Sequence, residues 1–86
     1  RYTSNHIFSY IELDEQHAII EVAVPEDWQG RSIGELDIRR KYGVNILGVK
    51  RENKTDVNIS PETVLDADMT LLVLGENQKL KKHFRL

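Results

Sequence analysis

The stretch at residues 32–51 constrains the fold most, because it carries the signals for both ends of a helix and for the strand that follows. Ser32, with Glu35 three positions later, forms the capping-box pattern, in which each side chain satisfies a free backbone N–H at a helix start. Gly43 is placed to adopt the left-handed conformation that ends a helix. The residues after it, VNILGV, are apolar and β-branched. The stretch therefore predicts one continuous helix, a glycine stop and a short strand.

The predicted helix has a stripe that suits a sheet and one apolar residue outside that stripe. At about 100° per residue, Ile33, Leu36 and the stem of Arg40 share one face. Ile38 falls on nearly the opposite side, which predicts either a lone exposed isoleucine or a contact with a second subunit or a ligand. Arg39 lies between the two faces, and its planar charged group suits a phosphate or a carboxylate.

The remaining segments predict a mostly antiparallel sheet. The pattern HAIIEVAV alternates between two faces, and Pro25 ends it because proline cannot donate to a strand ladder. Trp28 is expected to fold onto the core. Before the helix we expect strands over 8–13 and 17–24 joined by a turn at 14–16, and a loop at 26–30. After it we expect a strand over 44–49, a turn over 52–56, a very short strand or extended segment over 57–59, and an extended segment over 63–65. A turn over 66–68, a strand over 69–74 stopped by Gly75 and a terminal helix over 76–84 complete the chain. This order predicts an α+β two-layer sandwich with helices on one face of the sheet.

Composition limits the possible functions. A chain of 86 residues with 40% hydrophobic content forms one domain with a modest core, which pairing with a second copy would stabilise. Its net charge of −2 provides no overall basic field for nucleic acid or an anionic membrane. The absence of cysteine excludes disulfides and thiolate chemistry. Because the chain begins with Arg1, we expect it to be a piece of a longer protein.

Catalysis, metal binding and nucleic-acid binding have little support in the sequence. His6, His17 and His83 share no metal-ligand spacing, and no nucleophile elbow, P-loop or glycine-rich dinucleotide motif is present. A basic run near the end of the chain is typical of a solvated helix face, with His83 as one of its solvated residues, and it contains Lys79, Lys81, Lys82, His83 and Arg85. We therefore expect no enzyme, no metal site and no nucleic-acid partner.

A longer pattern runs through nearly the whole chain. It consists of Trp28 and Gly30, then Ile33, Leu36, Ile38, Arg39, Tyr42 and Gly43, then Ile46, Val49, Lys50 and Arg51, then Pro61, and finally the closing run DMTLLVLG at 68–75. With this pattern the chain resembles the C-terminal regulatory domain of potassium-transport proteins, called RCK_C or TrkA-C. One departure is Ala67, where the family usually has glycine, and it affects only the expected turn geometry.

The resemblance implies a function. It implies that residues 1–86 form a homodimeric, non-catalytic, ligand-binding RCK_C domain, joined in the same chain to a nucleotide-binding RCK_N domain. It also implies a cytoplasmic assembly, peripheral to the inner face of the plasma membrane, that gates a membrane potassium-channel or transporter subunit. In Ktr-type gating subunits the similar domain is a receptor for cyclic di-AMP, which lies across the dimer axis, and no other cofactor is implied.

The resemblance also assigns residues to the ligand. Ile33 and Ile38 match the apolar contacts to the adenine rings, Arg39 and Asn45 the phosphate contacts, and Asp37 and Pro61 the rim of the site. The chemistry agrees, because a two-fold symmetric ligand can receive each contact twice from an isologous interface. Each residue also has a purely structural reading: Arg39 as a helix cap, Asn45 as a turn residue, Pro61 as a strand breaker. Two alternatives stay open, a module that only dimerises and one that binds another nucleotide, an amino acid or a metal ion for a different cation transporter.

Overall fold

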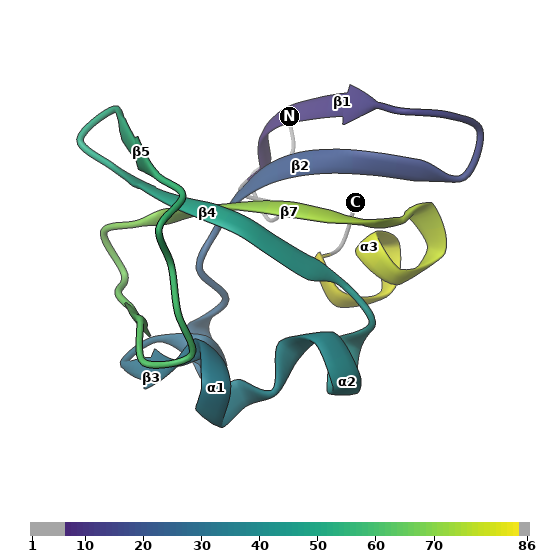
Figure 1. The fold of residues 1–86 in the computed structure, drawn as a ribbon. Helices are drawn as coiled ribbons and strands as arrows, with labels where there is room; N and C mark the ends of the chain where they lie inside the picture. Colours follow the sequence, from purple (N-terminus) through teal and green to yellow (C-terminus); the bar gives the residue numbers. More distant parts are fainter. Residues whose placement is uncertain (1–6, 85–86) are drawn as a thin grey trace.

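The structure, a computed structural model, describes residues 7–84 and consists of one main sheet with helices on one side (Figure 1). Its elements are β1 (Ile7–Glu12), β2 (His17–Ala23), a 3₁₀ turn (Glu26–Trp28), β3 (Arg31–Ser32), α1 (Ile33–Leu36), α2 (Ile38–Tyr42), β4 (Asn45–Arg51), β5 (Lys54–Asp56), β6 (Val64–Leu65), β7 (Thr70–Glu76) and α3 (Asn77–Phe84). The main sheet has the order β1-β2-β7-β4-β5, and all its neighbouring strands are antiparallel. The predicted α+β sandwich is confirmed.

The core lies between the helices and the sheet face turned toward them, here called the inner face. In β2 the residues Ala18, Ile20 and Val22 are buried while their neighbours are only half-buried, as the alternating sequence predicts. β7 shows the same alternation. Trp28 is buried, as expected, and its ring lies 5.0 Å from that of Tyr42 between centroids. The hairpin of β1 and β2 and the terminal helix are also confirmed.

The predicted continuous helix is wrong, because the chain breaks at Asp37. Asp37 has φ 53° and ψ 49°, a left-handed conformation that aspartate tolerates better than most residues. The break changes the direction of α2, so that Ile38 turns into the core and Arg40 turns out to solvent. Burial of Ile38 thus outweighs helix continuity, which a periodicity calculated for one straight helix cannot show.

Two strand boundaries also differ from the prediction. Residues 57–59, expected as a very short strand or an extended segment, form no strand. The expected turn over 52–56 is shorter, because β5 takes up Lys54–Asp56 and pairs with β4 through a turn in which Glu52 and Asn53 both have positive φ, as a type I′ hairpin requires. Gly75 does not stop β7, which continues to Glu76. The turn over 66–68 is confirmed, since the Met69 N–H donates to the Asp66 carbonyl at 3.1 Å despite Ala67.

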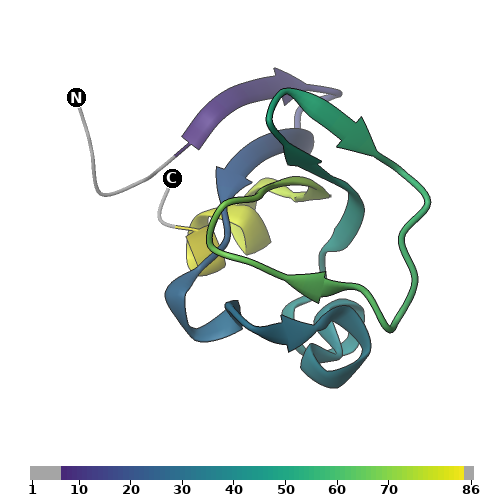
Figure 2. The same cartoon turned by 90° about the vertical axis from the view of Figure 1, so that its left-hand side faces the viewer.

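A second, two-stranded sheet was not expected. β3 pairs with β6 through Arg31 opposite Leu65 and Ser32 opposite Val64. Figure 2 shows this pair beside α1, on the helical side of the molecule. The extended segment over 63–65 is therefore a partner for the residues that lead into α1.

Candidate functional site

The start of α1 is fixed to the loop of residues 60–63 by its backbone. The Ile33 N–H donates to the Thr63 carbonyl at 2.9 Å, and the Gly34 N–H donates to the Pro61 carbonyl at 2.8 Å. A Cβ on Gly34 would lie 2.9 Å from the Pro61 Cβ, so only glycine permits this approach. The structure therefore brings together two of the predicted site residues, Ile33 and Pro61.

The capping box at this helix start is only half formed. The Ser32 Oγ accepts the Glu35 N–H at 3.1 Å, as predicted. The Glu35 carboxylate instead accepts from the Arg31 Nε at 3.2 Å. Helix α1 thus begins at Ile33 as expected, and its first turn is supported by the 60–63 loop rather than by a reciprocal cap.

The break at Asp37 separates two arginines with different surroundings. Arg40 pairs with the Asp37 carboxylate at 2.5 Å. Arg39 is exposed in the first turn of α2, and no ion pair involving it is found within residues 7–84. A guanidinium without a carboxylate partner keeps all its donors for an anionic ligand.

Ile38 does not lie where the helix periodicity placed it. Only 3% of it is exposed, and it belongs to the core cluster together with Trp28 and Leu36. The expectation of an exposed apolar side chain is therefore wrong, and this residue offers no wall to a ligand on the protomer surface. Apolar surface near the start of α1 comes instead from Val64, which is 44% exposed and lies opposite Ser32.

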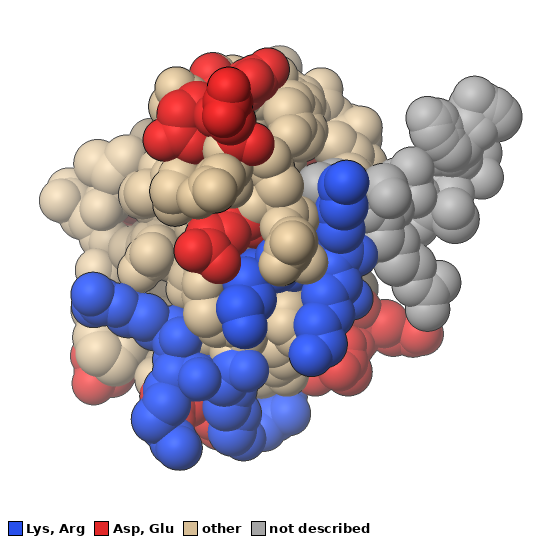
Figure 3. All heavy atoms as spheres, turned by 90° about the vertical axis from the view of Figure 1, so that its right-hand side faces the viewer, with Lys and Arg blue, Asp and Glu red and all other residues tan. Residues whose placement is uncertain are grey.

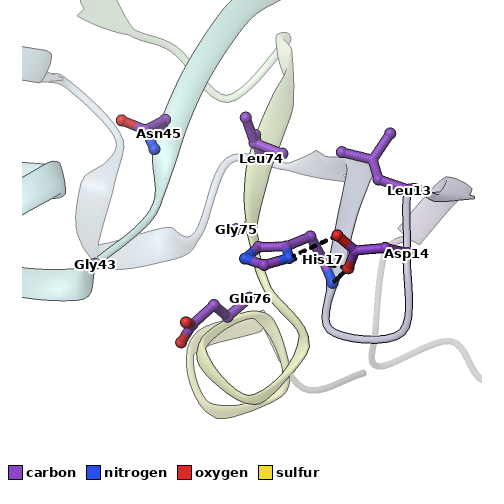
Figure 4. Close-up of a pocket in the computed structure, with 8 residues that line it drawn as sticks. All are labelled: Leu13, Asp14, His17, Gly43, Asn45, Leu74, Gly75 and Glu76. Atoms are coloured by element: carbon purple, nitrogen blue, oxygen red, sulfur yellow. Dashed lines mark hydrogen bonds and ion pairs between the residues drawn. The ribbon is translucent and has the colours of Figure 1, made fainter.

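Asn45 lies apart from the other predicted site residues. It is the first residue of β4 and sits opposite Leu74 on the outer face of the sheet, the face turned away from the helices. Its side chain lines a hollow of about 580 Å³ (Figure 4), whose lining residues are Leu13, Asp14, His17, Gly43, Asn45, Leu74, Gly75 and Glu76. The structure thus groups Asn45 with the β1–β2 turn and not with Ile33 and Pro61.

Asp14 organises one wall of that hollow. Its carboxylate accepts the backbone N–H groups of Gln16 and His17, each at 2.8 Å, and lies 2.9 Å from the His17 Nδ1. The hydrogen bond from Gln16, followed by that from the His17 ring, holds the pKa of Asp14 below its usual value. In the sequence, the polar turn at 14–16 was the one signal that pointed to this pair.

Cations gather over the helical layer. Figure 3 shows Lys and Arg side chains on the face that carries α2 and α3. Within this face His83 is half-buried and meets the Tyr42 ring edge-on at 4.9 Å between centroids, so the expectation of a solvated His83 is wrong. Burial, and then the charges of Lys82 and Lys79, lower the pKa of His83. His6 and Arg85 lie outside the described residues.

Neither a metal cluster nor a membrane span is found in the part of the chain that the structure describes. Residues 7–84 contain no group of three or more His, Cys, Asp or Glu side chains arranged to hold a metal ion. No helix among them has the length and apolar character needed to cross a bilayer.

Comparison with known proteins identifies the family. Residues 18–86 match the model of the TrkA-C domain. The chain is 35% identical over 72 residues to the Ktr system potassium uptake protein C of Bacillus subtilis (strain 168), covering 84% of this chain and 33% of that protein. The chain thus spans about a third of the length of this relative. It belongs to the TrkA-C (RCK_C) domain family.

Solved structures agree with this assignment. The RCK C domain of the potassium transport protein KtrA, solved in complex with cyclic diadenosine monophosphate, superposes with a TM-score of 0.73 at 32% identity, covering 80% of this chain and 81% of that one. The RCK domain of GsuK superposes with a TM-score of 0.76 at 28% identity, covering 91% of this chain and 17% of that one. The antiparallel sheet with helices on one face is therefore the RCK_C fold.

Proposed function

We propose that this domain is the regulatory, non-catalytic domain of a potassium-transport gating subunit and that it binds cyclic di-AMP across a homodimer interface. Membership of the TrkA-C family and the likeness to the KtrA domain solved with this ligand support the proposal. In this proposal the domain acts in the cytoplasm next to an RCK_N domain of its own chain and a membrane-bound channel or transporter subunit.

The observation that carries the proposal is the contrast between Arg39 and Arg40. Arg40 is neutralised by Asp37, whereas Arg39 is exposed and has no carboxylate partner within residues 7–84. A planar guanidinium binds a phosphate with two parallel hydrogen bonds. Two copies related by a two-fold axis present two such groups, which match the two phosphates of a symmetric cyclic dinucleotide.

The structure changes the role proposed for Ile38. Because it is buried, it holds α2 against the core and keeps Arg39 pointing outward, and Ile33 with Pro61 then provides the apolar and rim contacts next to the ligand. Asp37 contributes through the left-handed turn and through its pair with Arg40. Asn45, which lies beyond α2, stays a predicted phosphate contact from the same protomer or from its partner.

Isothermal titration calorimetry tests this proposal. We expect one cyclic di-AMP per two chains. Arg39→Ala should weaken binding roughly 100-fold or more, because it removes one charge-assisted contact from each of the two chains and each contributes about 1.5–3 kcal/mol. Arg40→Ala is the matched control, and it should change the affinity much less because its charge is already paired.

Two outcomes would contradict the proposal. Wild-type protein that gives neither heat nor a thermal shift with saturating cyclic di-AMP would leave dimerisation or the binding of another ligand as the function. Equal binding by Arg39→Ala and wild type would remove the phosphate assignment. Titration with other nucleotides, amino acids and divalent cations separates cyclic di-AMP from the alternative ligands.

A further inference from the structure

One end of the outer face of the main sheet is apolar, the other end carries Glu21, Lys50 and Thr70, and no helix lies over this face within residues 7–84. All three helices lie on the inner side (Figure 1). The strand register places Ile11 opposite Ile19 and Ile19 opposite Leu74, so these three side chains form one row across β1, β2 and β7. Ile11 is 54% exposed, and Leu13, just beyond the end of β1, is 51% exposed. A connected apolar row of this kind marks an interaction surface rather than scattered exposed residues.

The row leads into the hollow lined by His17 and Glu76, which face each other across the β2–β7 ladder. Asp14 holds the His17 Nδ1, and Figure 4 shows the other ring nitrogen of His17 turned toward the hollow. In the neutral tautomer whose Nδ1 donates to Asp14, that nitrogen is a hydrogen-bond acceptor. No hydrogen bond or ion pair of the Glu76 carboxylate is found among the described residues. The polar end of the hollow therefore offers mainly acceptors.

The walls of the hollow combine apolar and acidic side chains. Leu13 and Leu74 are apolar, while Asp14 and Glu76 carry negative charge. A lysine or arginine side chain fits this hollow, because its aliphatic stem can pack on the two leucines while its cationic end approaches the two carboxylates. A metal ion fits less well, because the described residues hold no cluster of three ligating side chains.

We infer that the outer face binds an amphipathic polypeptide segment of a partner protein. The apolar side of the segment packs on Ile11, Ile19 and Leu74, and a lysine or arginine next to that side enters the hollow between His17 and Glu76. Charge complementarity favours a basic segment over a second copy of the same face, which would bring the same acidic hollow and only Lys50 as a cation, and Lys50 is already paired with Glu21 at 3.6 Å. This surface lies on the opposite side of the sheet from Ile33 and Arg39 and shares only Asn45 with the proposed cyclic di-AMP site, and none of the residues that carry the inference is assigned to that ligand.

Selection of peptides from a random display library against the 86-residue chain tests this inference. We expect the enriched peptides to share a lysine or arginine among apolar residues. Glu76→Gln should weaken their binding about tenfold or more, as expected for loss of a charge-assisted contact. Glu26→Gln is the matched control; it removes a carboxylate from the 3₁₀ turn in the helical layer and should leave binding unchanged.

A second pair of variants tests the apolar row. Ile11→Ser should weaken the same peptides severalfold, whereas Val57→Ser, at a residue that is 67% exposed elsewhere, should not. Thermal unfolding of each variant shows whether it is folded. The inference is overturned if no peptide is enriched, if enriched peptides lack a cation, or if they bind Glu76→Gln like wild type. It is also overturned if Ile11→Ser converts a dimer of this chain into monomers, because the face would then belong to a second copy.

Discussion

The main sheet and the α1–α2 stretch differ in how they are held together. The central strands β2 and β7 are joined over seven residue pairs, and their inner-face residues are almost completely buried. The stretch from α1 to α2 has two helices of four and five residues, joined through a left-handed residue and fixed by backbone hydrogen bonds to the 60–63 loop. The sheet thus supplies stability, while the stretch holds exposed groups such as Arg39 in place. The two regions should respond to substitution in different ways.

The largest loss of stability is expected for a substitution in the core of the main sheet. Leu71 in β7 has no exposed surface, and Leu71→Ala leaves a cavity among tightly paired strands. Such truncations cost about 2–5 kcal/mol in the free energy of unfolding. Urea denaturation followed by circular dichroism measures this loss. A cost near that of the exposed control Val57→Ala would show that the sheet is not the stable region.

A smaller loss of stability, centred on the contact between α1 and the 60–63 loop, is expected when Gly34 is substituted. The added methyl group of Gly34→Ala would meet Pro61 at 2.9 Å, so the 60–63 loop has to move. Overpacking of this kind costs about 1–3 kcal/mol. If the proposed site is correct, cyclic di-AMP affinity falls as well, because Ile33 and Pro61 separate. Glu35→Ala on the same helix is the control, and calorimetry at a temperature where both variants are folded compares the two. Unchanged affinity in folded Gly34→Ala would exclude Pro61 from the rim.

The left-handed turn at Asp37 offers a finer test of the same stretch. Valine resists this conformation, so Asp37→Val should cost about 1–2 kcal/mol in the free energy of unfolding. Asp37→Asn tolerates the conformation and loses only the charge interaction with Arg40, so its cost should be about 0.5 kcal/mol or less. Chemical denaturation of the two variants gives the comparison. Equal costs would mean that the ion pair, rather than the backbone, holds the break.

The same difference between the regions explains what the sequence could predict. Strands β2 and β7 were predictable because their residues alternate between a buried and a half-buried face, and this alternation stays the same when the strand ends move by a residue or two. The burial of Ile38 was not predictable, because a helical wheel assumes a straight helix and one left-handed residue at 37 changes the direction of every later side chain. β5 was missed because its pairing depends on positive φ at Glu52, a residue that carries no such preference.

The candidate site shows the same limit. Arg39 could be chosen from sequence because its chemistry does not depend on its neighbours, and its exposure agrees with that choice. The absence of a carboxylate partner for Arg39 within residues 7–84 could not be predicted, because Asp37 is two positions from Arg39 and three from Arg40, and only the fold decides which arginine it pairs with. The outer-face hollow joins residues 13–17, 43–45 and 74–76, three segments far apart in sequence, so no local pattern indicates it.

The smallest expected effect is on the pH dependence of stability and concerns His83 in α3, which contacts Tyr42 in α2. Burial and two lysines keep its pKa below the usual value near 6.5, so the unfolded chain binds a proton more readily than the folded one. The free energy of unfolding should therefore fall as the pH drops below about 6.5 and level off below the folded-state pKa. His83→Gln should flatten this part of the profile, which thermal unfolding between pH 7.5 and 5 measures. If His83→Gln leaves the pH profile of stability unchanged, the Tyr42 ring accommodates the protonated His83 ring. The packing between α2 and α3 would then be looser than the packing within the sheet.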